Sequence, residues 1–210
     1  MSDILNRVGA WQGLTAKSDG VTDVIKKTYV TKDIQELMIY ADTFNAEKRY
    51  FKKLAQLLRG SNDAETCRNV YNFVRLNVKY VRDALNYDTV KSAVKTLEDG
   101  YGDCKVMTLT SGAILRELGI NYRLRFVSYD NTKNVTHVYL IANTEGVDVI
   151  IDCVYHAFNR QANFRYFEDY YVYGKQNAAK INGIVESVGG LSLGKAAFFA
   201  FVAYVLYKNN

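Results

Sequence analysis

The sequence predicts an α+β fold, in which a group of helices precedes an antiparallel sheet and a central helix packs on that sheet. Apolar residues recur every three or four positions in segments before Gly119, and every second position in three segments after it. A single change of period along the chain favours α+β over an alternating parallel fold. The 210 residues are 49% hydrophobic and 23% charged, which is a globular composition with enough chain for a substantial core.

The first 60 residues are predicted to form a helical extension of the core. Residues 1–30 lack a clear period and are interpreted as a loop anchored by Trp11, and two helical patterns fill residues 31–60. Gly60 is expected to end the second helix. The predicted organisation is a helical extension over 1–60, a core over 61–175 and an apolar tail helix over 176–210.

The core is expected to begin with a helix whose first residue follows Ser61, Asn62 or Asp63, all of which are good caps. Its apolar stripe includes Cys67 and Val74 at helical spacing. Residues 82–103 are interpreted as a connection that contains one helical turn at most.

The central helix is predicted from about Cys104 to Leu118. Asp103 is a natural N-cap, and Gly119 is a natural stop because glycine tolerates the left-handed conformation that often follows a helix. This helix therefore places a thiol in its first turn, where free amides and the helix dipole favour a thiolate.

Alternating patterns predict three strands in a meander, "NYRLRFVSY", "THVYLIAN" and "VDVIIDCVY", with the turn "NTEG" between the last two. The segment "NFRYFEDYYVYG" is a candidate fourth strand. Arg123 and Arg125 lie opposite Leu124 on the first strand and are interpreted as a solvated face, with binding of a substrate carboxylate as the alternative.

Thiol-based acyl transfer needs a thiolate, an imidazole and a polar group that orients the imidazole. The chain has two histidines. His137 begins the second predicted strand and Asp152 ends the third, so neighbouring antiparallel strands would bring them to one edge, where the central helix could present Cys104. His156 is the rival base, and each of these residues could instead be structural.

The ordered set "GDC" at 102–104, "LGI" at 118–120, "THVYL" at 136–140 and "IID" at 150–152 resembles the transglutaminase-like superfamily, which shares papain's chemistry. The upstream segments "VKYVRD" and "TLEDGYGDC" are similar to bacterial and phage members. The resemblance implies that Cys104 is the nucleophile, His137 the base and Asp152 the orienting acid. Lys105 follows the cysteine where bacterial and phage members commonly have an acidic residue.

The resemblance implies a cysteine-dependent peptidase, amidase or acyltransferase that acts on a protein or peptide through a thioester. Hydrolysis is favoured over crosslinking because the large flanking β-domains of eukaryotic transglutaminases are absent. The alternative is a structural or assembly protein, such as a phage virion component made in a bacterial host, that keeps the fold with reduced or no catalysis.

The remaining features concern partners and location. The three cysteines Cys67, Cys104 and Cys153 form no metal-like cluster and favour a reducing, cytoplasmic compartment, and neither a cofactor nor a metal is predicted. The net charge of +5 is dispersed, so no nucleic-acid partner is predicted. The apolar segment 188–207 predicts self-association, virion assembly or membrane contact.

Overall fold

The computed structural model describes residues 2–15, 17–18, 22–26, 35, 38, 51–84 and 87–173. Met1–Gly174 form one compact unit, and the predicted tail helix lies beyond it, outside the described residues. Most of the helical pattern predicted for 31–50 is also outside them. Among the described helices, none has the length and apolar character needed to cross a membrane.

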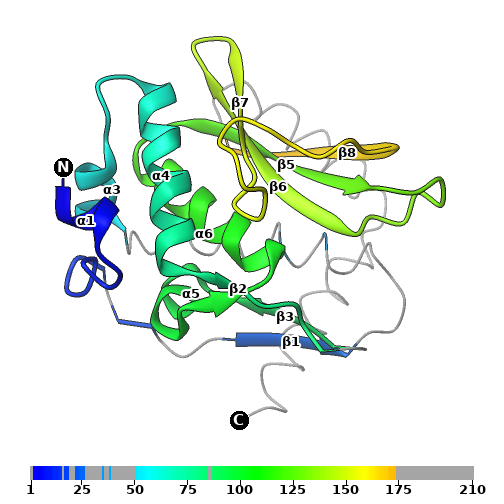
Figure 1. Ribbon diagram of the computed structural model, residues 1–210, viewed down its shortest axis with the longest axis horizontal. Coiled ribbons are helices and arrows are strands. Elements are labelled where there is room, and N and C mark those ends of the chain that lie inside the picture. The colour runs from blue at the N-terminus through cyan, green and yellow to red at the C-terminus, as the bar shows by residue number, and fades with distance from the viewer. Residues whose placement is uncertain are drawn as a thin grey trace, which may run out of the picture. The chain divides into compact units, whose positions relative to one another are not determined.

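The predicted α+β class is confirmed (Figure 1). The helices are α1 (Ser2–Asn6), α3 (Lys52–Leu58), α4 (Asp63–Asn77), α5 (Ala93–Asp99) and α6 (Cys104–Glu117). The strands are β1 (Thr22–Lys26), β2 (Lys79–Tyr80), β3 (Tyr87–Lys91), β4 (Tyr101–Gly102), β5 (Asn121–Ser128), β6 (His137–Thr144), β7 (Val147–Ile151) and β8 (Tyr166–Tyr173).

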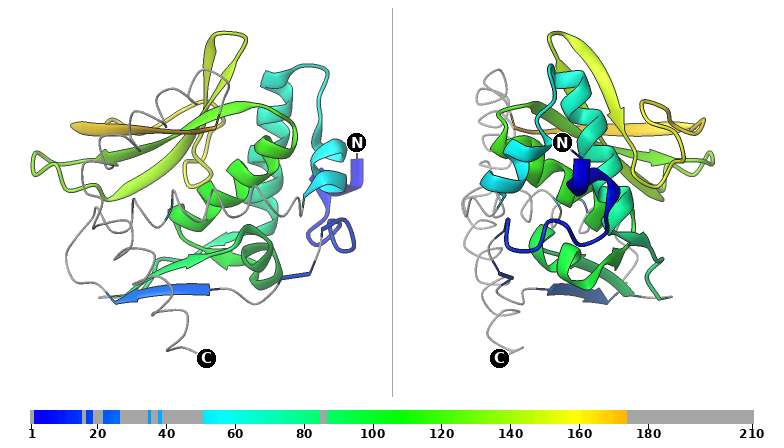
Figure 2. Two further views of the ribbon diagram at one scale, coloured as in Figure 1. Left: turned by 180° about the vertical axis from the view of Figure 1, so that it is seen from behind. Right: turned by 60° about the vertical axis from the view of Figure 1, so that its left-hand side comes forward.

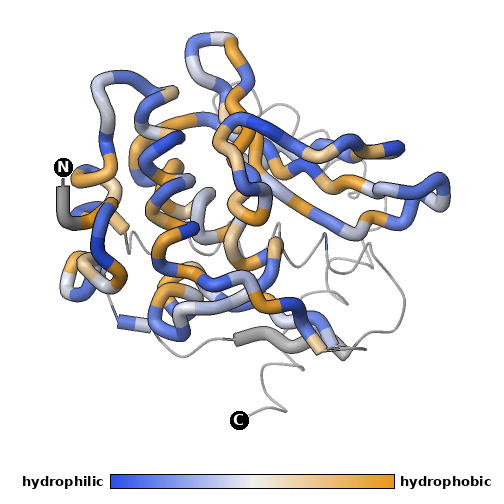
Figure 3. Tube along the Cα trace, viewed as in Figure 1, coloured by the Kyte–Doolittle hydropathy of each residue, from blue (hydrophilic) through white to orange (hydrophobic). Residues whose placement is uncertain are grey.

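The main sheet has the strand order β7-β6-β5-β8, with every neighbouring pair antiparallel. The predicted meander of three strands and the candidate fourth strand are therefore both present. The hydropathy of these strands can be followed along the chain in Figure 3. On β5, Tyr122, Leu124 and Phe126 are buried in the main core, as their spacing predicted.

Helices α4 and α6 pack on that apolar face of the sheet, as the two further views show (Figure 2). The core between the layers includes Phe73, Leu109, Ile114 and Leu140, whose side chains are completely buried. Burial of each such side chain contributes about 1.5–3 kcal/mol. The sheet and α6 are thus fixed relative to each other by packing.

The ends of α6 are set by local sequence. Asp103 caps its start by accepting a hydrogen bond from the Lys105 amide at 3.0 Å. At its end, the amides of Gly119 and Ile120 donate to the carbonyls of Arg116 and Leu115 at 3.0 and 3.1 Å, and Gly119 has φ +74°. This is a Schellman motif, so the predicted cap and stop are both confirmed.

Two expectations about connecting segments were wrong. The segment predicted as a connection over 82–103 contains β3 and the two-turn helix α5. Part of the predicted N-terminal loop forms β1, which pairs antiparallel with β3. Trp11 is buried, as expected for an anchor.

Candidate active site

Cys104 is the first residue of α6 and is partly exposed. Its amide lies in the first turn, where an α-helix offers no intrahelical acceptor, while the next amide is already bonded to the Asp103 cap. A thiol and a backbone donor therefore lie together at a helix start. This position can hold an anionic sulfur and can also donate to an oxyanion.

His137 and Asp152 lie together at one edge of the main sheet. Leu140 on β6 pairs with Ile151 on β7, so Asp152 follows at the level of Tyr139, two residues from His137 on the same face. His137 Nε2 is 2.8 Å from Asp152 Oδ2, and the Asp152 side chain is only 3% exposed. The antiparallel register thus brings the first residue of β6 beside the residue that follows β7.

The surroundings of His137 favour its protonated form. Burial alone would lower the pKa of His137, but hydrogen bonds and charges of Asp152 and Cys104 outweigh burial and raise the pKa to about 10. Because Asp152 contacts Nε2, Nδ1 is the ring nitrogen left to interact with Cys104. The arrangement therefore favours an imidazolium beside Cys104.

A polar stripe on α6 joins the cysteine to both partners. Thr108, one turn after Cys104, donates from Oγ1 to the carbonyl of Val138 at 3.1 Å, directly after His137. Ser111, two turns after Cys104, has its Oγ 3.4 Å from the sulfur of Cys153, directly after Asp152. In the sequence, this stripe is indicated by two polar residues, Thr108 and Ser111, four and seven positions after Cys104 in a largely apolar helix.

Helix α4 holds the turn that follows Asp152. Arg75 Nη1 donates to the carbonyls of Cys153 and Tyr155 at 3.0 and 2.8 Å, and the Tyr71 hydroxyl donates to the Tyr155 carbonyl at 2.8 Å. These contacts fix the backbone next to the carboxylate. They could not be read from sequence because they join segments about 80 residues apart.

Two tyrosines that the sequence did not single out lie beside the thiol. The Tyr129 ring stacks on His137, with centroids 6.1 Å apart and an interplanar angle of 23°. Burial, together with the charges of Asp152 and Cys104, raises the pKa of Tyr129 to about 12. Burial and the Cys104 charge also raise the pKa of Tyr80, on β2. Both side chains are almost half exposed, so both can contact a substrate.

The other cysteines and the other histidine lie elsewhere. Cys67 and Cys153 are buried, and burial raises the pKa of each thiol to about 12. These values match the interpretation of both as core thiols. His156 is exposed, and its ring packs on Tyr155 with centroids 4.5 Å apart.

The described residues contain one group of carboxylates close enough to hold a cation, formed by Asp83, Asp88 and Asp103. The ammonium of Lys105 lies against all three, at 3.0 Å from Asp88 Oδ1 and 3.3 Å from Asp83 Oδ2. The position that a metal would take is thus filled by a side chain of the protein.

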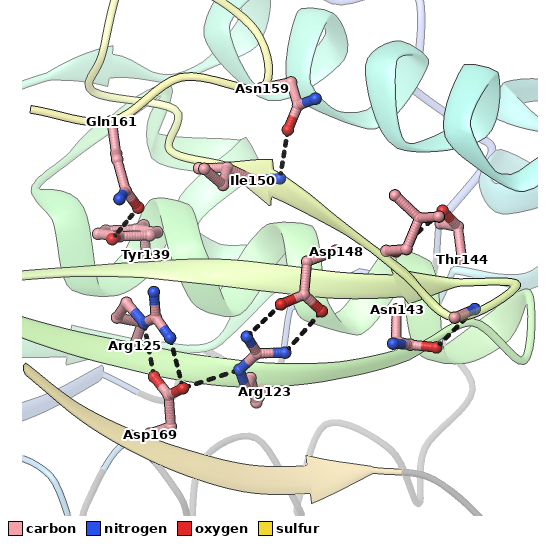
Figure 4. A network of polar contacts seen from close by, with 12 residues as sticks. Arg123, Arg125, Tyr139, Asn143, Thr144, Asp148, Ile150, Asn159, Gln161 and Asp169 are labelled. Carbon is pink, nitrogen blue, oxygen red and sulfur yellow. Dashed lines mark hydrogen bonds and ion pairs between the residues drawn. The ribbon is translucent and has the colours of Figure 1, made fainter.

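The interpretation of Arg123 and Arg125 as a solvated face was wrong (Figure 4). Arg123 is 9% exposed and pairs with Asp148 and Asp169, while Arg125 pairs with both oxygens of Asp169 at 2.7 and 2.6 Å. The carboxylates come from strands β7 and β8. This network therefore joins strands β5, β7 and β8 on the face opposite the helices.

Comparison with known proteins adds the family. A sequence profile described as the transglutaminase-like superfamily matches residues 52–177, more than half of the chain. A search of curated proteins finds no match.

Two crystal structures are similar. One, a proposed protease from Parabacteroides distasonis, is 13% identical with a TM-score of 0.46, over 58% of this chain and 25% of its own. The other, a proposed cysteine protease from Cytophaga hutchinsonii, is 18% identical with a TM-score of 0.39, over 63% of this chain and 48% of its own. The chain thus spans a quarter and about half of these proteins.

Proposed function

The chain belongs to the transglutaminase-like superfamily, and from that premise we propose that it is a cysteine-dependent peptidase or amidase that works through a thioester. Cys104 is the nucleophile, His137 the general acid and base, and Asp152 the residue that orients the imidazole. The observation that carries the proposal is the 2.8 Å contact between His137 and Asp152, in a site where Cys104 also raises the pKa of the same imidazole.

In the first half of the reaction, the Cys104 sulfur attacks the carbonyl carbon of an amide and the carbonyl oxygen becomes an oxyanion. The Cys104 amide is the donor available to that oxygen at the start of α6. The C–N bond then breaks as the His137 imidazolium gives its proton to the leaving amine, which leaves an acyl group on sulfur.

In the second half, neutral His137 takes a proton from water as the water oxygen attacks the thioester. The C–S bond breaks, the carboxylic acid leaves, and the thiolate and imidazolium are restored. An amine in place of water would give a new amide by the same steps, so acyl transfer is the alternative outcome at this site.

The two histidines provide a matched test. Full-length protein is incubated with casein, and cleavage is followed by new amino termini while transfer is followed by incorporation of a fluorescent primary amine. Cys104→Ala and His137→Gln are expected to lose activity by about 10³-fold or more, whereas His156→Gln retains it. Retained activity in Cys104→Ala, or equal losses in the two histidine variants, would overturn the proposal.

A structural readout accompanies the assay. Iodoacetamide at neutral pH is expected to add one group to the native protein, at Cys104, because Cys67 and Cys153 are buried. Intact-mass measurement shows the number of groups, and Cys104→Ala should remove the adduct. Equal labelling of all three cysteines in the folded protein would contradict a distinct nucleophile.

A further inference from the structure

A buried ammonium lies directly behind the candidate nucleophile. Lys105, the second residue of α6, is 6% exposed, and its Nζ contacts Asp103, Asp88 and Asp83. The three carboxylates come from the α6 cap, from β3 and from the segment after β2. The lysine that follows Cys104 is therefore held at the centre of three acids rather than exposed to solvent.

This arrangement answers an electrostatic problem at the start of α6. The helix needs the Asp103 cap, but a carboxylate next to Cys104 disfavours a thiolate, and Asp83 and Asp88 add to that effect. A cation among the three acids removes part of their field. Burial alone would lower the pKa of Lys105, but Asp103 and Cys104 raise it well above its ordinary value, so the ammonium stays charged.

We propose that Lys105 is a positioning residue for the Cys104 thiolate, which it stabilises by neutralising the acids behind the helix start. Groups with negative and with positive charge both act on Cys104. Asp103 disfavours the anion, and so do the tyrosines if they ionise, while the positive partners are the His137 imidazolium and Lys105. The titratable groups that interact electrostatically with Cys104 are Tyr80 on β2, Lys105 in α6, Tyr129 after β5 and His137 on β6. Asp103 precedes Cys104 as the cap of α6, and Asp152 contacts His137.

The inference rests on the proposed role of Cys104, but its test does not need turnover. The rate of alkylation of Cys104 by iodoacetamide is measured from pH 5 to about pH 10 in full-length protein, and the midpoint of the profile reports where the thiolate forms. If the protein does not cleave casein but substitution of Lys105 still shifts this midpoint, the inference holds. If substitution of Lys105 does not shift the midpoint, the inference fails, but the cleavage result is unaffected.

Lys105→Met is expected to raise the midpoint by about one pH unit and to slow alkylation about tenfold at pH values below the native midpoint, whereas Lys105→Arg keeps both near the native values. The acids take up protons at low pH when the ammonium is gone, so the effect is measured by the shift of the midpoint rather than by the rate at the acidic end of the profile. Lys95→Met is the control for removal of a lysine, because Lys95 pairs with Asp99 on α5.

Asp83→Asn separates electrostatics from simple disruption of the network. Asp83 is the most exposed of the three acids, with a side chain 20% accessible, so this variant is expected to fold. Removing its charge should lower the midpoint, opposite to Lys105→Met. An unchanged midpoint in folded Lys105→Met, or a rise in Asp83→Asn, would overturn the inference. If Lys105→Met does not fold, the direction in Asp83→Asn decides alone.

Discussion

Asp152 holds His137 and the turn after β7 at the same time. Its Oδ2 lies 2.8 Å from His137 Nε2, while its Oδ1 accepts the amides of Val154 and Tyr155 at 3.1 and 3.3 Å. One carboxylate therefore sets the direction of the imidazole relative to the backbone. Because the side chain is buried, these bonds have little competition from water.

The two functions of this carboxylate can be separated by substitution. Asp152→Ala removes both sets of bonds and is expected to lower kcat by about 10²-fold or more, because the imidazole is no longer oriented. Asp152→Asn keeps an oxygen for the turn, but its amide group is a donor facing the Nε2–H donor, so this variant should fold like the native protein and still lose activity. The measurement is kcat for casein-derived peptides, with circular dichroism as the check on folding. Retained activity in folded Asp152→Asn would show that a carboxylate is not needed beside the imidazole.

The titration of His137 gives a second prediction. Its pKa of about 10 lies above the ordinary 6.5, so the folded state is stabilised fully below pH 6.5 and loses that contribution as pH rises through 10. Cys104→Ala removes one of the two partners that raise the pKa and should shift the midpoint down by about one unit or more. NMR of histidine-labelled protein resolves the titration, because the chain has two histidines.

The exposed His156 is the internal reference in that experiment. Its ring packs on Tyr155, so a change confined to the His137 signal in Cys104→Ala would report the loss of the thiol. An unchanged midpoint for His137 in the variant would mean that the thiol does not stabilise the imidazolium. Cys67→Ala removes a thiol from the core and serves as the matched cysteine control.

The sequence was sufficient for the parts of the site that depend on local signals. Asp103 and Gly119 fixed α6, and the change of period identified β5 and the strands that carry His137 and Asp152. Helix α5 also has local signals, since Ser92 caps it and Gly100 ends it with φ +71°. Its seven residues were overlooked because a two-turn helix is too short to show a clear period.

The features that sequence did not reveal depend on distant partners. Lys105 contacts Asp83 and Asp88, which precede it by 22 and 17 residues. No local pattern indicates that these segments fold back onto the start of α6. Arg123 was interpreted as solvated because alternation assigns it to the face away from the core. A second set of carboxylates from β7 and β8 covers that face.

Thr108 offers a test of how α6 is aligned with β6. Thr108→Val keeps the shape of the side chain but removes the hydrogen bond to the Val138 carbonyl, which is buried. We expect a loss of about 1–3 kcal/mol in the free energy of unfolding and about a tenfold fall in kcat, because the cysteine and histidine are no longer held in register. Thr108→Ser retains the hydroxyl and is the control. A fall in stability with unchanged kcat would limit Thr108 to a structural role.

The packing of Gly102 against Val106 explains why a glycine precedes the cysteine by two residues. A Cβ at this position would lie 2.1 Å from Cγ2 of Val106 in the first turn of α6, and valine has little freedom to rotate away. Gly102→Ala should therefore displace the helix start, with a loss of about 1–3 kcal/mol in the free energy of unfolding and slower alkylation of Cys104. Val106→Ala removes the obstructing methyl groups, so the double variant should recover much of the alkylation rate that Gly102→Ala loses. The double-mutant cycle is read from chemical denaturation and from alkylation rates. Additive losses in the double variant would exclude this contact as the cause and would assign the need for glycine to the backbone of β4 instead.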